Sequence, residues 1–113
     1  MSYNVKNFNF FDYNFFIKLK KKPIFINTSR GEVLNEKDLL RALKNSYLKY
    51  AAVDVIKNEQ SILHKKNILL EYAKENNNLF VTPHIAGLTY ESEKIAAQIS
   101  IKNLINFFIE KKH

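Results

Sequence analysis

The chain has 113 residues, 46% of them apolar, which is enough for one modest hydrophobic core and too little for a second domain. Its formal charge of +7 admits a nucleic-acid partner, but only two of its 18 basic residues are arginines, so we predict no nucleic acid and keep that function as the least favoured alternative. The absence of cysteine excludes disulfides and cysteine-ligated zinc. Because no apolar run approaches the roughly 20 residues that span a bilayer and no signal-peptide pattern opens the chain, we expect a cytoplasmic protein without a membrane partner.

The first element predicted by the sequence is an amphipathic helix. Residues 1–9 show no period, and we expect an irregular entry there. Apolar side chains then recur at helical spacing, from Phe11 through Phe15 and Phe16 to Leu19. Lysines gather at residues 18–22, where cations suit the end of a helix, and Pro23 should stop it.

A strand, a helix and a second strand follow. Residues 24–27 form a short apolar run that ends in a polar turn at residues 28–31. Asn35 is a helix-capping residue, so the next helix should occupy residues 36–45. The run 51–55 is again strand-like. A strand, a crossover helix and a strand at this spacing predict a parallel pair.

The remaining elements repeat this alternation. Residues 56–66 are polar and predict an exposed loop that contains Glu59. A short helix at residues 68–74 should lead to a third strand that starts at Leu79 and ends near His84. The longest helix should begin after Thr89, an N-cap candidate, and continue to Phe108.

The three predicted strands each end in residues that can carry chemistry. Arg30 follows the first strand, Asp54 and Glu59 follow the second, and His84 follows the third. Because the carboxyl ends of parallel strands share one edge of a sheet, we expect these side chains to converge into an acid/base site with an anion clamp. The chain's two glycines, Gly31 and Gly87, lie in the same turns, where a positive φ or a close backbone approach would require them.

Three segments carry a resemblance to a known family. INTSRG (residues 26–31), AAVDV (51–55) and VTPHIAGLT (81–89) resemble, in this order, the D-isomer-specific 2-hydroxyacid dehydrogenases, which include phosphoglycerate dehydrogenases. The resemblance extends from about Phe11 to Phe108. It implies an α/β, partial Rossmann-like fold with three parallel strands and helices on both faces. It also implies an oxidoreductase that uses NAD to interconvert a small-molecule 2-hydroxy acid and its 2-keto acid.

The resemblance assigns the catalytic roles. His84 matches the acid/base that moves the hydroxyl proton, a task for which histidine is suited near neutral pH. Glu59 matches the carboxylate that pairs with this histidine and favours the imidazolium. Arg30 matches the residue that grips the substrate carboxylate with its planar, permanently charged fork. For each residue alone, a surface ion pair is the alternative.

The resemblance also implies contacts to NAD. Asp54 matches an aspartate that hydrogen-bonds the nicotinamide carboxamide, and Thr28 matches a position whose backbone faces the same ring. The cofactor-binding residues are expected to be Thr28, Ser29, Arg30, Asp54, His84, Ile85, Ala86 and Gly87. We expect no metal site, because the other histidines, His64 and His113, have no paired spacing and are expected to be solvated.

The sequence departs from the family in details of the Glu59 loop and in the parts that it lacks. Gln60 follows Glu59 where a proline is usual, and the interval from Glu59 to His84 is slightly long, as a loop insertion would make it. With two glycines, the chain cannot hold the G-x-G-x-x-G turn that binds pyrophosphate, and a separate substrate domain is also missing. We therefore expect a fragment of a cofactor domain. The alternatives are a non-catalytic remnant and a subunit that needs a homo-oligomer or a complementary chain.

Overall fold

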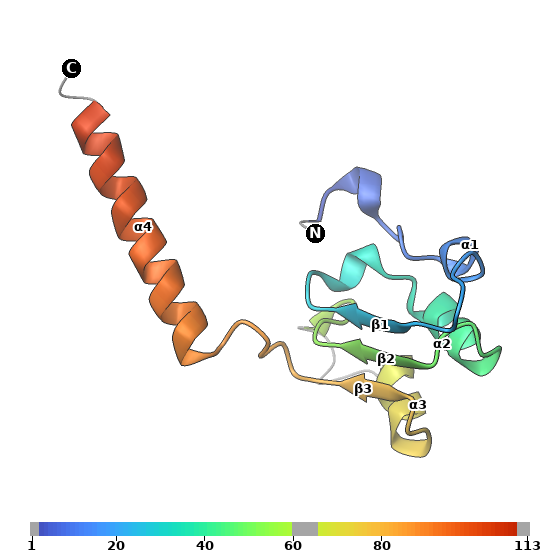
Figure 1. Cartoon of the computed structure of the whole chain (residues 1–113). Coiled ribbons are helices and arrows are strands. Elements are labelled where there is room, and N and C mark those ends of the chain that lie inside the picture. Colours follow the sequence, from blue (N-terminus) through green and yellow to red (C-terminus); the bar gives the residue numbers. More distant parts are fainter. Residues whose placement is uncertain (1–2, 60–65, 111–113) are drawn as a thin grey trace.

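The computed structural model describes residues 3–59 and 66–110 (Figure 1). The predictions for His64 and His113, and most of the predicted loop at residues 56–66, lie outside the described residues. The described elements alternate between helices and strands. In chain order they are η1 (Val5–Asn7), α1 (Tyr13–Phe16), β1 (Ile24–Asn27), η2 (Gly31–Val33), α2 (Glu36–Lys44), β2 (Tyr50–Val53), α3 (Ile68–Glu75), β3 (Leu79–Val81) and α4 (Tyr90–Glu110).

The three strands form one parallel sheet in the order β1-β2-β3, as predicted. Phe25 is in register with Ala51, and Ala51 with Leu79. Helices α2 and α3 are the crossovers that return the chain to the start of the next strand (Figure 1). This sequential winding brings all three strand ends to the same edge.

The hydrophobic core lies on one face of the sheet. Side chains alternate along β1, so that Phe25 and Asn27 are buried while Ile24 and Ile26 are exposed. The buried face packs against α1, α2 and α3. The core residues include Phe16, Phe25, Leu34, Leu39, Ala42, Leu43, Leu48, Ala51, Val53, Leu69 and Leu79.

The opposite face corrects the prediction of helices on both faces. Within the described residues the helices cover one face only, and Ile24, Ile26 and Phe80 remain exposed on the other. The reason is the winding direction. Because β1, β2 and β3 follow one another in one direction, right-handed crossovers place α2 and α3 on the same side.

The first helix is much shorter than predicted. α1 spans Tyr13–Phe16, and Asp12 caps it by accepting from the Phe15 N–H at 2.8 Å. The lysine run does not extend it: α1 ends at Phe16, and further along Lys21 and Lys22 adopt the left-handed conformation with φ of 65° and 46°, which a right-handed helix does not contain. The aromatic positions still serve the core, with Phe16 fully buried.

Helices α2 and α4 begin at the predicted caps. The side chain of Asn35 accepts from the N–H of Asp38 at 3.2 Å, and that of Thr89 accepts from the N–H of Ser92 at 3.1 Å. Helix α4 extends away from the sheet (Figure 1). Its side chains from Tyr90 to Ile109 are exposed. In the described part of the chain, no helix combines the length and the apolar character needed to cross a membrane.

Candidate functional site

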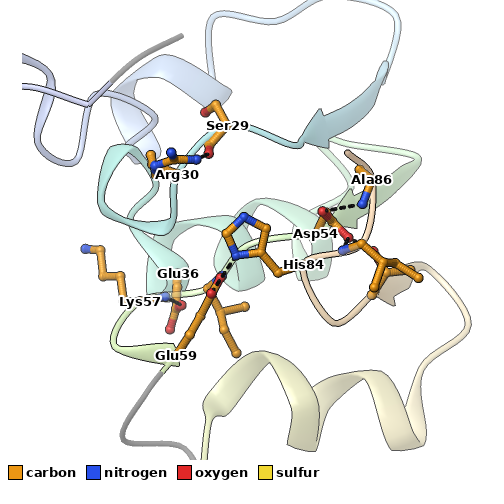
Figure 2. A network of polar contacts seen from close by, with 11 residues as sticks. Ser29, Arg30, Glu36, Asp54, Lys57, Glu59, His84 and Ala86 are labelled. Atoms are coloured by element: carbon orange, nitrogen blue, oxygen red, sulfur yellow. Dashed lines mark hydrogen bonds and ion pairs between the residues drawn. The ribbon is translucent and has the colours of Figure 1, made fainter. Parts of the chain in front are cut away.

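The predicted catalytic residues lie at the carboxyl edge of the sheet. Arg30 follows β1, Glu59 follows β2 and His84 follows β3, and all three line one open cavity of about 420 Å³. The structure therefore brings these residues together as predicted (Figure 2). An exposed cation, a carboxylate and an imidazole around one cavity can bind an anion and exchange a proton with it.

His84 and Glu59 form a direct pair. The Nδ1 atom of His84 lies 2.8 Å from Oε2 of Glu59, while Oε1 of Glu59 accepts from the N–H of Ile56 at 3.0 Å. When Nδ1–H donates to the carboxylate, Nε2 is the nitrogen left for a ligand, and Figure 2 shows it turned away from Glu59. His84 has a φ of 56°, an uncommon backbone conformation for a residue other than glycine, and its side chain lines the cavity.

The turn that carries Arg30 is built on Asn27, a buried polar residue at the end of β1. The Asn27 Oδ1 atom accepts from the N–H of Ser29 at 3.1 Å and from its hydroxyl at 2.8 Å, while Nδ2 donates to the carbonyl of Arg30 at 3.1 Å. The guanidinium of Arg30 donates to the carbonyl of Ser29 at 2.7 Å and is otherwise exposed. The backbone of the turn is thus fixed while the guanidinium stays open to an anion.

Asp54 holds the loop that carries His84. It is 5% exposed, and its Oδ1 accepts from the hydroxyl of Thr82 and from the N–H of Ile85, while its Oδ2 accepts from the N–H of Ala86 at 2.9 Å. The carbonyl of Asp54 also accepts from the N–H of His84 at 2.9 Å. These contacts surround His84 on both sides in sequence, so Asp54 fixes the backbone from which the imidazole projects (Figure 2).

The environment of Asp54 favours its charged form. Burial raises the pKa of its carboxyl, but the hydrogen bonds from Thr82, Ala86 and Ile85 and the nearby His84 outweigh burial and lower that pKa below its ordinary value. The carboxylate is therefore ionised while it binds the loop. Its carboxylate oxygens already accept three hydrogen bonds within the chain, and its predicted contact with a nicotinamide carboxamide stays a prediction.

The other predicted cofactor residues surround the same edge. Thr28 is exposed at the end of β1, and residues 84–87 are exposed beyond β3. Open backbone on both sides of the cavity suits a flat amide-bearing ring, so the donor set here fits the nicotinamide end of NAD. Among the residues that the structure describes, no group of His, Asp and Glu could hold a metal ion.

The two glycines have different roles from one another. A Cβ on Gly31 would lie 2.3 Å from the carbonyl carbon of Ile56, so the predicted close backbone approach is confirmed there. For Gly87 the prediction is wrong, because no glycine has a positive φ and a Cβ at Gly87 would meet nothing within 4 Å. Gly87 lies in open space at the start of the segment that leads to α4.

Sequence reasoning missed two residues that shape the site. Asn27 lies on the buried side of an alternating strand, where a polar residue needs a local partner, and this pattern could have identified it. Glu36 accepts from the N–H of Lys57 at 2.8 Å and from the side chain of Asn67 at 3.2 Å. No local signal predicts these contacts, because their partners lie 21 and 31 residues away in sequence.

Comparisons with known proteins identify the family of the chain. Residues 1–86 match the model of the family described as "D-isomer specific 2-hydroxyacid dehydrogenase, NAD binding domain". The chain is 38% identical over 103 residues to erythronate-4-phosphate dehydrogenase of Bacteroides thetaiotaomicron, a match that covers 91% of this chain and 27% of that protein. It is 36% identical over 97 residues to D-lactate dehydrogenase of Staphylococcus epidermidis, covering 79% of this chain and 29% of that protein.

The fold is also similar to solved structures of dehydrogenases. The crystal structure of D-lactate dehydrogenase with NAD+ from Lactobacillus jensenii superposes with a TM-score of 0.75 at 26% identity, covering 93% of this chain and 34% of that one. The chain thus spans 27% to 34% of the length of these three relatives. By its family match and by its fold, the chain belongs to the D-isomer specific 2-hydroxyacid dehydrogenases, as part of their NAD-binding domain.

Proposed function

We propose that the chain supplies the acid/base and anion-binding side of an NAD-dependent D-2-hydroxyacid dehydrogenase site. The observation that carries this proposal is the His84–Glu59 pair, with Nδ1 and Oε2 2.8 Å apart, on the same cavity as Arg30. The relatives support it, because they are dehydrogenases of erythronate-4-phosphate and D-lactate. The relatives act on different acids, so the proposal names the substrate class, a D-2-hydroxy acid, and no single acid.

The reaction assigns each of the three residues a task. Reduction of a 2-keto acid adds a hydride to C2 and a proton to the carbonyl oxygen, and NADH supplies the hydride when it is bound. Arg30 binds the substrate carboxylate, and His84 donates the proton from Nε2 while Glu59 holds Nδ1. In the oxidation direction, the same Nε2 accepts the hydroxyl proton. Residues 28–30 and 84–87 hold the nicotinamide end.

The second candidate has two forms. The chain is either a subunit that requires a second copy or a complementary chain, or it is a non-catalytic remnant. The uncovered face of the sheet and the exposed apolar side chains of α4 favour the partner-requiring form. The composition agrees, because the chain's two glycines cannot form the G-x-G-x-x-G turn that holds a dinucleotide pyrophosphate. A cytoplasmic location stays a prediction.

Calorimetric titration with NADH distinguishes the two candidates. If the chain holds only the nicotinamide end, we expect a dissociation constant no tighter than roughly millimolar, which corresponds to a binding free energy on the order of −4 kcal/mol. We also expect no turnover with a 2-keto acid. Hydride transfer needs the ring and the substrate carbon about 3–3.5 Å apart, which a loosely held cofactor does not provide. Micromolar affinity for NADH would exclude the remnant and show that the chain, as an assembly, completes its own cofactor site.

The catalytic assignment is tested in a complete enzyme. A chimera that carries residues 24–87 of this chain in place of the matching segment of the Staphylococcus epidermidis D-lactate dehydrogenase should oxidise NADH with a 2-keto acid. His84→Ala in the chimera should lower turnover by roughly 10²-fold or more through the loss of acid/base catalysis. His64→Ala, which lies in the same exchanged segment but outside the described residues, is the matched control. Equal losses from the two variants would refute the assignment.

A further inference from the structure

Glu36 joins two segments that flank Glu59 in sequence. It lies in the first turn of α2, where its Oε1 accepts from the backbone N–H of Lys57 at 2.8 Å and its Oε2 accepts from the side-chain amide of Asn67 at 3.2 Å. Lys57 precedes Glu59 by two residues, and Asn67 caps the start of α3. We propose that Glu36 is a positioning residue, which acts on the reaction by fixing the backbone from which Glu59 reaches His84 (Figure 2). This inference rests on the proposed function.

The connection from Glu36 to His84 passes through two successive amides. The N–H of Ile56 donates to Glu59 at 3.0 Å, and the next N–H, that of Lys57, donates to Glu36. Asn58 adopts the left-handed conformation with a φ of 54°, which turns the chain back so that the Glu59 side chain reaches Ile56. The second oxygen of Glu59 then contacts Nδ1 of His84. A displacement of the Ile56–Lys57 peptide therefore moves the carboxylate that orients the imidazole.

The same peptide lies directly against the turn that carries Arg30. A Cβ on Gly31 would be 2.3 Å from the carbonyl carbon of Ile56 and 2.6 Å from the nitrogen of Lys57. Gly31 follows Arg30 immediately, so the Ile56–Lys57 peptide is the contact between the anion clamp and the acid/base pair. Glu36 accepts from the N–H of this same peptide, so it holds in place the backbone that lies against Gly31.

The contacts of Glu36 with Lys57 and Asn67 separate this role from the general effect of an acidic residue at a helix start. An acidic residue in the first turn of a helix is stabilising wherever its side chain points, because it interacts with the helix dipole. Asp38 occupies the same first turn of α2, and the structure gives its carboxylate no contact with Lys57 or Asn67. Asp38→Ala is therefore the matched control, because it removes a charge from the same helix end and leaves the contact with Lys57 in place.

The experiment is nuclear magnetic resonance of the full chain, with the ¹⁵N shifts of the His84 imidazole as the readout. In the parent chain Nδ1 should carry the proton, because it donates to Glu59. In Glu36→Ala this preference should be lost, and the amides of Ile56 and Lys57 should exchange about tenfold faster or more. Asp38→Ala should change neither signal. Circular dichroism checks whether each variant folds.

Glu36→Gln keeps the test decisive if Glu36→Ala does not fold. It preserves the side-chain volume and one acceptor for Lys57, but it places an amide NH₂ against the NH₂ of Asn67, so the His84 shifts should change in the same direction and by less. Unchanged shifts in the folded variants, or an equal change in Asp38→Ala, would overturn the proposal. The proposed function has a separate test. It fails if a complete assembly that contains this chain, with the His84–Glu59 pair intact, turns over no 2-hydroxy acid.

Discussion

The backbone N–H of Asp54 donates to the carbonyl of Asn27 at 2.9 Å and joins the ends of β2 and β1. Each of these buried residues then directs its side chain to a different loop of the site. Asn27 fixes the turn that carries Arg30, and Asp54 fixes the loop that carries His84. Both loops are therefore anchored to the same pair of hydrogen-bonded residues at the sheet edge, and such support fixes the relative positions of the side chains that the loops carry.

Asp54→Asn should release the His84 loop without unfolding the sheet. The new amide NH₂ replaces one acceptor and faces the N–H of Ala86 or Ile85, leaving a buried donor without a partner at a cost on the order of 2 kcal/mol. We expect faster hydrogen exchange at Ile85 and Ala86, measured by nuclear magnetic resonance. Asp12→Asn is the control, because it changes a capping carboxylate of α1 that is remote in sequence from this loop. If exchange is equally slow in both variants, Asp54 does not hold the loop.

The same loop should loosen in acid. The pKa of Asp54 is lowered in the folded protein relative to its ordinary value of 3.8, since the charged form accepts the loop's hydrogen bonds. Its contribution to stability is therefore complete above pH 3.8 and is lost as the pH falls through the lowered folded pKa. The amide shifts of Ile85 and Ala86 followed from pH 6 to 2 check this. A transition above pH 3.8, or one that persists in Asp54→Asn, would contradict it.

The convergence of the three side chains on one cavity was predictable from the sequence because it follows from topology. Three strands that alternate with helices must be parallel, and parallel strands bring their following residues to one edge. Arg30, Glu59 and His84 therefore needed only their positions after the strands. Asn27 and Glu36 act through contacts that depend on side-chain direction, and the contacts of Glu36 span more than 20 residues, so local patterns did not reveal it.

The fold departs from the prediction in the length of the first helix and in the cover of the second sheet face. The aromatic spacing from Phe11 to Leu19 predicted a helix through the lysines, but Lys21 and Lys22 take the left-handed conformation and the helix ends at Phe16. The spacing correctly placed Phe16 in the core. The cover of the second sheet face could not be inferred from periodicity, because alternation shows which side chains share a face and not what packs on that face.

Gly31→Ala should destabilise the chain and disturb the site together. The added Cβ would lie 2.3 Å from the carbonyl carbon of Ile56, which is backbone and cannot rotate aside, so a loss of about 1–3 kcal/mol in the free energy of unfolding is expected. Gly87→Ala should change the same free energy by less than about 0.5 kcal/mol, because its Cβ meets open space. Urea unfolding of the two variants measures the difference. Similar losses would mean that Gly31 is not packed against Ile56.

Self-association should follow from the apolar surface that the described chain leaves uncovered. Helix α4 exposes Leu104 and Phe108, which lie one turn apart on one side of the helix, and the bare sheet face exposes Ile26. Burying each such side chain is worth roughly 1.5–3 kcal/mol, so contact between two copies is favourable. We expect dimers or larger assemblies at micromolar concentration in analytical ultracentrifugation, and a clean monomer at high concentration would refute this. The paired variant Leu104→Lys and Phe108→Lys should shift the protein toward monomer if α4 carries the contact, whereas Ile26→Lys should do so if the sheet face carries it.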